Sequence, residues 1–158
     1  MPNNYKSDLV TKQEAAAQMQ SAGVRDGDDL AGHLLYATAV VTAGVGGSTP
    51  VVPAAGDTLQ LVDLPAGAVV VPQLSHVTGA VSGTLVLDIG DAGTSNRFGK
   101  VSMTGNAAAT FSSNGLASAA VTPARLTDPV RMIATLGTVT SVPGGTKLVV
   151  TIAYRVKG

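Results

Sequence analysis

The sequence contains no cysteine and no tryptophan, and only five of its 158 residues are aromatic. Without cysteine, the chain has no disulfides, no thiolate zinc ligands and no thiol nucleophile. Ten basic and ten acidic residues cancel, and charged residues make up only 13% of the chain, about half the usual share. A neutral chain with so little Lys and Arg lacks the basic surface that nucleic-acid binding requires. We therefore predict no nucleic-acid partner.

Long apolar runs are also missing. No stretch of about 18 apolar residues escapes interruption by Gly or Pro, so no membrane span is expected. Residues 1–20 are polar and lack the apolar centre of a secretion signal, so we expect no signal peptide. The low charge fits either a small Ala-rich domain or a domain whose surface largely meets other chains. Solvent-facing positions usually carry Lys and Glu, which are scarce here.

What the sequence does contain begins with a helical signal near the N-terminus. Residues 11–14, Thr-Lys-Gln-Glu, have the form of a capping box, and good helix formers follow up to Gln20. Gly23 is a plausible end for this helix. Its apolar positions are mostly Ala, so it would be marginal in isolation. We predict that residues 1–32 form a short helix or a docking arm, with a frayed tail as the alternative.

From residue 33 onward the pattern is typical of short β-strands separated by turns rich in Gly, Pro, Asn and Asp. Residues 57–64 alternate, with Leu59 and Leu61 on one face, and residues 147–156 alternate most clearly. No helical crossover pattern lies between the strands, which disfavours parallel βαβ units. The prediction for residues 33–158 is a mainly β, antiparallel, jelly-roll-like sandwich. Its expected strands cover residues 33–42, 57–64, 67–71, 74–80, 84–89, 98–104, 129–136 and 147–156.

The stretch from residue 101 to residue 124 carries no charge and is full of Ala, Ser, Asn and Gly. This composition predicts a long loop or an insertion. Long loops in compact domains are usually functional or mobile, so the stretch is also a candidate for contact with a partner.

Chemistry-bearing residues are few. His33 and His76 lie far apart in the sequence, and neither has a second ligand at metal-binding spacing, so no zinc site is predicted. Asp88 and Asp91 bracket a two-residue link, and Asp57 and Asp63 are candidates to lie near them in the sheet. Paired carboxylates can hold a hard cation or perform acid–base catalysis. A strand-end Asp-Ile-Gly-Asp is also a good turn, in which Asp side chains cap backbone amides.

Familiar catalytic and ligand-binding motifs fail on inspection. Residues 26–29 resemble a calcium loop, but the position that needs a bidentate Glu is occupied by Ala37. Residues 44–47 are rich in Gly but have no βαβ unit around them, and no Gly-x-Ser-x-Gly elbow is present. We therefore assign no catalytic residue, no cofactor and no metal ligand, and we do not predict an enzyme. An enzymatic interpretation depends entirely on the four aspartates named above.

Three segments, taken in order, resemble a known class of proteins. Residues 57–68 read as strand, Leu-Pro-x-Gly turn and strand, followed by residues 83–92 and by the closing strand at 144–154. This order resembles small structural proteins of tailed bacteriophages, in particular head decoration (cement) proteins with a jelly-roll-like sandwich. The resemblance covers residues 33–158. It implies a non-enzymatic virion protein, made in the bacterial host cytoplasm, that sits on the capsid surface. It also implies the major capsid protein as partner, self-association as a dimer or trimer, and stabilisation by bridging coat subunits.

The scarcity of charge points to residues 5–20 and 101–124 as contact segments. Deletion of residues 1–20 is then expected to abolish shell binding and leave the β domain folded. Other phage components, such as a tail, neck or fibre-base protein, remain alternatives. A carbohydrate-binding or adhesive sandwich is a further alternative, although few aromatic side chains are present to stack on sugars. The predicted contact side chains with the shell or another subunit are Tyr5, Leu9, Val10, Met19, Phe111 and Leu116.

Overall fold

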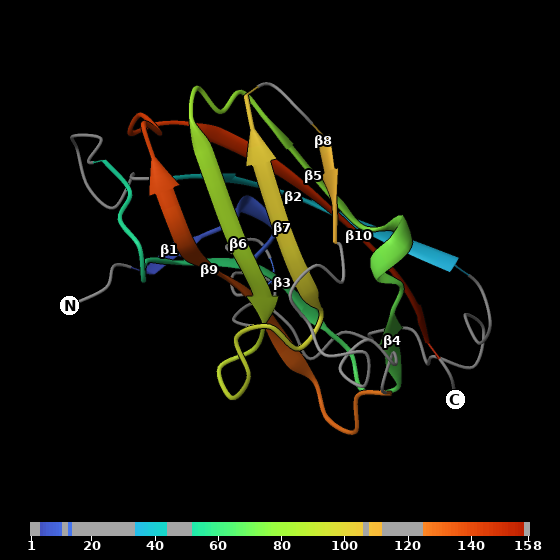
Figure 1. Cartoon of the computed structure of the whole chain (residues 1–158). Coiled ribbons are helices and arrows are strands. Elements are labelled where there is room, and N and C mark those ends of the chain that lie inside the picture. The colour runs from blue at the N-terminus through green and yellow to red at the C-terminus, as the bar shows by residue number, and fades with distance from the viewer. Residues whose placement is uncertain are drawn as a thin grey trace.

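The computed structural model describes residues 4–10, 13, 34–43, 52–105, 108–111 and 125–156. More than half of the described residues lie in β-strands, and the strands are arranged in two layers (Figure 1). The strands are β1 (Asn4–Lys6), β2 (Leu34–Thr42), β3 (Thr58–Leu64), β4 (Ala68–Val70), β5 (His76–Gly79), β6 (Thr84–Gly90), β7 (Gly99–Thr104), β8 (Ala108–Thr110), β9 (Val130–Thr140) and β10 (Lys147–Val156), and a short 3-10 helix, η2 (Pro72–Leu74), precedes β5.

The strands form two sheets, which we call the first and the second sheet. The first sheet has the order β1-β3-β9-β6-β7, and the second has the order β2-β10-β5-β8, with β4 also paired to β10. Every pair is antiparallel except β1 with β3, which is parallel. The predicted mainly β, antiparallel sandwich is confirmed.

The strand pairs are nested around the β6–β7 connection. β6 pairs with β7, β5 with β8, β3 with β9, and β2 with β10. These are the pairs of one long hairpin, rolled so that successive pairs fall alternately in the first and the second sheet. Such a rolled hairpin is the jelly-roll arrangement. Only β1 and β4 lie outside the nested set.

The core lies between the two sheets and is filled by alternate residues of each strand. Leu85, Leu87 and Ile89 of β6 are fully buried, as are Leu148 and Ile152 of β10. Both sets lie on the faces that the sequence pattern indicates. The prediction was therefore right where a strand keeps strict alternation.

β3 departs from the predicted alternation because of a β-bulge. The register with β9 shifts between Gln60 and Val62, so the strand gains one residue relative to its partner. As a result Leu61 and Val62 are both buried. The side chains of Gln60 and Asp63 both bond to Arg131 of β9, which lies outside the core. A regular strand would have pointed these two polar side chains to opposite faces.

The predicted loop over residues 101–124 is wrong at its start. Residues 101–104 belong to β7, and Ala108–Thr110 form β8 at the end of the second sheet. Val101 and Met103 are buried, whereas Ser102 between them is exposed. The strand predicted over residues 98–104 is confirmed as β7, whereas the loop predicted from low charge and small residues wrongly covers the end of β7 and all of β8. Residues 106, 107 and 112–124 of the predicted loop lie outside the described residues.

The beginning of the predicted N-terminal arm is part of the sandwich. β1 pairs with β3, and residues 8–10 and 13 have helical backbone. Tyr5 and Val10 are buried, with exposed fractions of 3% and 0%. Helical backbone therefore occurs earlier than the capping-box interpretation placed it. Of that box only Gln13 is described, and Thr11, Glu14 and residues 15–32 lie outside the described residues.

Candidate interaction surface

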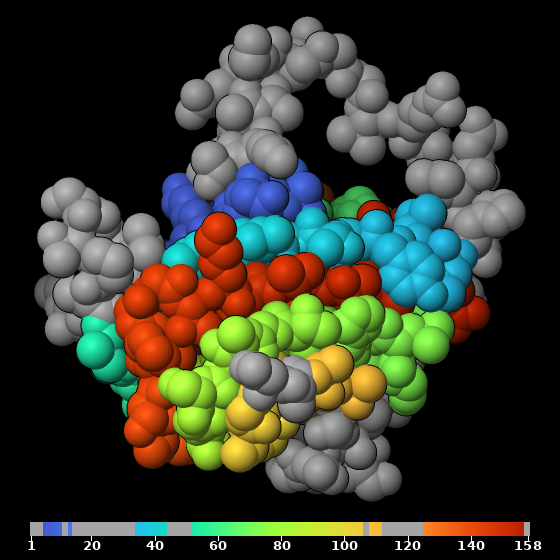
Figure 2. All heavy atoms as spheres, turned by 90° about the horizontal axis from the view of Figure 1, so that it is seen from above, coloured from blue at the N-terminus to red at the C-terminus, as the bar shows by residue number. Residues whose placement is uncertain are grey.

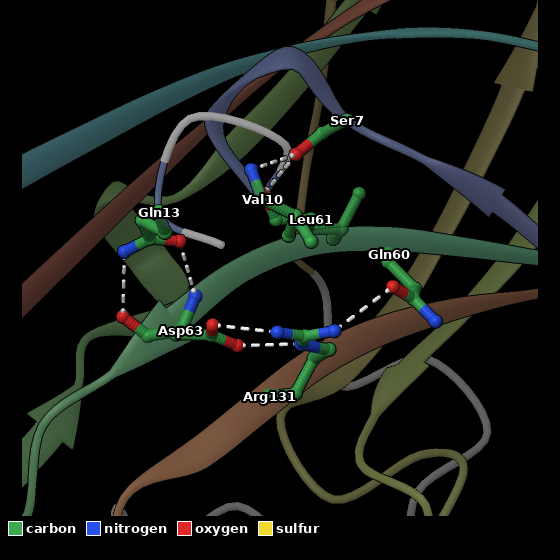
Figure 3. A network of polar contacts seen from close by, with 7 residues as sticks. All are labelled: Ser7, Val10, Gln13, Gln60, Leu61, Asp63 and Arg131. Atoms are coloured by element: carbon green, nitrogen blue, oxygen red, sulfur yellow. Dashed lines mark hydrogen bonds and ion pairs between the residues drawn. The ribbon is translucent and has the colours of Figure 1, made fainter. Parts of the chain in front are cut away.

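Ser7 ties the N-terminal segment to the outer edge of β3 (Figure 3). Its N–H donates to the carbonyl of Gln60 at 2.6 Å, and its hydroxyl donates to the carbonyl of Leu61. The same hydroxyl oxygen accepts the N–H of Val10 at 3.0 Å, as an N-cap serine does at the start of a helical turn. One buried side chain thus joins the end of β1, the helical turn and β3.

Gln13 bonds to the same edge of β3 further along the strand. Its side-chain carbonyl accepts the N–H of Asp63 at 2.9 Å, and its side-chain amide donates to the carbonyl of Asp63 at 3.2 Å (Figure 3). The amide therefore imitates a paired strand. β1, Ser7 and Gln13 together satisfy the edge of β3 from Thr58 to Asp63. An edge satisfied in this way cannot template the pairing of another chain.

Arg131 of β9 bonds to two side chains of β3, those of Asp63 and Gln60. Its Nε and Nη2 atoms donate to the two carboxylate oxygens of Asp63 at 2.7 and 2.8 Å, and its Nη1 donates to the Gln60 side chain at 3.2 Å. This two-point contact needs Gln60 and Asp63 on one side of β3, which the bulge provides. Both charged side chains remain partly exposed, so the pair contributes at most about 1 kcal/mol to folding.

The four aspartates considered as a cation or catalytic set are held by separate partners. Asp57 is buried and accepts the Tyr5 hydroxyl at 3.3 Å and the Ala54 N–H at 3.0 Å. Asp88 pairs with Lys100 across β6 and β7 at 3.2 Å, and Asp63 pairs with Arg131. Within the described part of the chain, no three His, Cys, Asp or Glu side chains are grouped to hold a metal ion.

Asp91 forms the turn that the sequence indicated. Its Oδ1 accepts the N–H groups of Gly93 and Thr94, both at 2.8 Å, and its Oδ2 accepts the Arg97 guanidinium at 2.7 Å. Burial alone raises the pKa of the Asp91 carboxyl. The bonds from Arg97 and from the two backbone N–H groups outweigh that effect, so the net pKa lies below its ordinary value. Asp88 makes no such turn and serves in an ion pair instead.

The side chains predicted to contact a shell are mostly committed to the core. Tyr5, Val10 and Phe111 have exposed fractions of 3% or less, and Leu9 is half-buried against the same core. Met19 and Leu116 lie outside the described residues. The predicted shell contact of these six residues stays a prediction. In the described conformation the three buried side chains offer no surface to another chain.

The outer faces of the two sheets differ in charge. The first sheet carries the pairs Asp63–Arg131 and Asp88–Lys100 on its outer side. No strand of the second sheet contains an acidic residue. Its only Lys and Arg within strands are Lys147 and Arg155, toward the two ends of β10. The first sheet thus shows paired charges, and the second shows almost none.

We call the part of the outer side of the second sheet that lies between Lys147 and Arg155 of β10 the β2 face. In Figure 2 the strands β2, β10, β5 and β8 lie side by side across one side of the molecule. Three of the five exposed large apolar side chains in the described chain belong to β2: Leu34, Tyr36 and Val40. The Thr38 and Thr151 hydroxyls meet at 3.4 Å between β2 and β10. The β2 face consists of Leu34, Tyr36, Thr38, Val40, His76, Thr78, Ala108, Thr110, Val149 and Thr151.

Sequence reasoning placed a strand at residues 33–42 but did not identify this face. The signal was present, because alternate residues from Leu34 to Val40 carry no charge although they occupy one side of a strand. The N-terminal contacts with β3 had no comparable signal, since a parallel pairing between residues far apart leaves no local pattern.

No described helix is long and apolar enough to cross a membrane.

Comparison with known proteins places the fold. No protein-family model matches the sequence, and no curated protein matches it closely enough to count as a relative. Among solved structures, the chain is similar to a chain from the capsid of Ralstonia phage GP4, with a TM-score of 0.57 and 20% identity over 98% of both chains. It is also similar to a chain from the capsid asymmetric unit of cyanophage Pam1, with a TM-score of 0.49 and 17% identity over 89% of this chain and 96% of that one. The similarity to the GP4 chain establishes a shared fold along nearly the whole length.

Proposed function

We propose that the protein is a non-enzymatic structural component of a phage virion, which binds the outside of the capsid and stabilises it by bridging coat subunits. The shared fold with a chain of the GP4 capsid supports a place in a capsid, because the likeness covers 98% of both chains. The resemblance of residues 33–158 to head decoration proteins points the same way. The engagement of all four candidate aspartates in structural contacts supports a role without catalysis.

The observation that carries the proposal is the contrast between the two outer faces. Charged side chains are costly to remove from water unless they are paired, and interface centres are accordingly depleted in charge. The β2 face has apolar and hydroxyl side chains where a solvated face would carry Lys and Glu. Its burial against a coat subunit would gain about 25 cal/mol per Å² of apolar area, less the cost of association. The β2 face is therefore the surface that we assign to the shell.

Bridging follows from multivalency. A capsid offers the same site many times in a fixed array. When one site is bound, an assembly that presents two or more β2 faces meets the next site at a high effective concentration. Each contact can then be weak while the whole assembly stays attached. Reinforcement of the shell arises because separation of neighbouring coat subunits would break several such contacts at once.

The test adds charge to one outer face at a time. The double variant Thr78→Lys/Thr110→Lys places two lysines on the β2 face, away from the β2 strand. The matched control, Ser102→Lys/Thr104→Lys, places two lysines on the outer side of β7 in the first sheet, where both residues are exposed. Co-sedimentation with purified coat-protein shells is expected to fall at least tenfold in affinity for the first variant and to stay unchanged for the control. Equal binding by both variants would overturn the assignment of the face, and no binding by the unmodified protein would overturn the capsid proposal.

A further inference from the structure

β2 is the end strand of the second sheet, and two hydrogen bonds show which way its peptide groups point. On the β10 side, the Ala43 N–H donates to the carbonyl of Thr146 at 2.9 Å. On the opposite side, the Val40 N–H donates to the Asp8 carboxylate at 2.6 Å. Because these directions alternate along a strand, the N–H and C=O groups of residues 34, 36 and 38 also point away from β10. No described residue pairs with those three peptide groups.

Asp8 limits where another strand can add to β2. By accepting the Val40 N–H, it occupies the edge at that point. Among the described residues, none is paired with this edge over residues 34–38. This segment has Tyr36 at its centre and an outward-pointing peptide group at each end. A segment that is symmetric in this way can pair with an identical segment about a two-fold axis.

We infer that β2 pairs antiparallel with β2 of a second copy of the chain, with the two-fold axis at Tyr36. In this register residue 36 lies opposite residue 36 of the other copy, and residue 34 lies opposite residue 38. Each facing pair exchanges two N–H···O bonds, as the closely spaced pairs of an antiparallel ladder do. The N–H and C=O groups of residues 34, 36 and 38 would then be bonded to the second copy, and the two second sheets would form one continuous sheet.

Charge and exposed area favour a second copy as the occupant. The segment 34–38 carries no charge, and the net charge of the chain is zero, so two copies approach without repulsion. Tyr36 and Leu34 are 57% and 39% exposed, and both side chains gain apolar contacts across the axis. Facing aromatic pairs on one side of an antiparallel ladder are favourable. Arg155 lies in β10, opposite Leu34 of β2 and therefore one strand away from the interface between the two copies. It does not face a like charge across that interface.

The pairing needs nothing from a capsid, so it stands or fails separately from the proposed shell binding. Its consequence for the virion does rest on the proposed function. Two β2 faces joined through β2 point to the same side of the assembly, which is the arrangement that bivalent attachment needs.

The test uses the absence of cysteine from the full chain. Tyr36→Cys places its thiol opposite the same thiol in the other copy, at a Cα separation of about 5.5 Å that a disulfide can span. Mild oxidation is expected to convert most of this variant to a covalent dimer. Ser102→Cys, an exposed position on the end strand of the first sheet, is the control and should stay monomeric in a denaturing gel. Thr38→Cys should not cross-link alone but should do so when combined with Leu34→Cys.

A second pair of variants avoids covalent chemistry. Tyr36→Lys and Tyr36→Asp each bring two like charges together at the axis, so each is expected to sediment as a monomer. An equal mixture of the two is expected to recover the dimer of the unmodified protein, because unlike charges then face each other. A monomeric or trimeric unmodified protein, or equal cross-linking of Tyr36→Cys and Ser102→Cys, would overturn the inference. Protection of the Tyr36→Cys thiol only when coat shells are present would also overturn it, because the occupant would then be a coat strand.

Discussion

At the scale of single residues, small polar side chains have structural roles that could not be predicted from the sequence. The Ser75 hydroxyl donates to the Val71 carbonyl at 2.9 Å and accepts the Ala153 N–H at the same distance. It therefore completes the pairing of β10 at the point between β4 and β5, where no strand is opposite. Nothing in the sequence around residue 75 distinguished it from a turn serine. Its role depends on a strand that lies far away in the chain.

Ser75→Ala should be costly because it leaves the buried Ala153 N–H without an acceptor. The expected loss is about 1–3 kcal/mol of unfolding free energy, the range for an unsatisfied buried polar group. Chemical denaturation followed by circular dichroism measures this loss. Ser82→Ala is the control, since the Ser82 hydroxyl also bonds to a carbonyl but is exposed, and its change should stay within about 0.5 kcal/mol. Equal effects of the two substitutions would contradict this role for Ser75.

Asp91 gives a prediction that depends on pH. Its pKa in the folded state lies below the ordinary value of 3.8. The carboxylate therefore stabilises the fold above pH 3.8, and this stabilisation is lost as pH falls through the folded-state pKa. Asp91→Asn should therefore lower stability by about 1 kcal/mol at neutral pH, where charge-assisted bonds to Arg97 and two backbone N–H groups are weakened. The difference between variant and parent should shrink below pH 3.8. A difference that is constant over the whole pH range would contradict this account.

At the scale of elements, strands that keep strict alternation were predictable and strands that depend on a distant partner were not. β6 and β10 bury alternate residues from Leu85 to Ile89 and from Leu148 to Ile152, and their sequence alone showed which face is buried. The bulge in β3 escaped prediction because it is defined by the register with β9. β8 escaped because Ala and Thr at low charge resemble a loop until a neighbouring strand is known. The parallel pairing of β1 with β3 leaves no local signal.

The N-terminal segment gives the prediction at this scale. Deletion of residues 1–13 removes Tyr5 and Val10 from the core and uncovers the edge of β3. We therefore expect a clearly lower melting temperature and aggregation on heating, rather than the intact β domain expected from the sequence. Val10→Ala alone should cost roughly 2 kcal/mol. Gln13→Ala is a milder probe, since it removes only the side-chain bonds to the Asp63 backbone. A truncated protein as stable as the full chain would show that this segment is only an appended arm.

At the scale of the whole molecule, the sequence indicated the fold class but not the order of strands. Composition and turn spacing predict a sandwich. The nested pairing of β6 with β7 outward to β2 with β10 depends on contacts between residues far apart in the chain. The candidate surface follows from that order, because only the assembled second sheet places the charge-poor outer sides of β2, β10, β5 and β8 together. The scarcity of charge was visible in the sequence, but its concentration on one face was not.

The central claim is that the β2 face binds a phage capsid shell in many copies. The measurement that tests it most directly is co-sedimentation of the purified protein with purified coat-protein shells, with bound copies counted at saturation. We expect saturation at a ratio set by the capsid lattice and loss of binding in Thr78→Lys/Thr110→Lys. Saturation at only a few copies per shell would place the protein at a neck or tail instead. No binding, or undiminished binding by the lysine variant, would contradict the account.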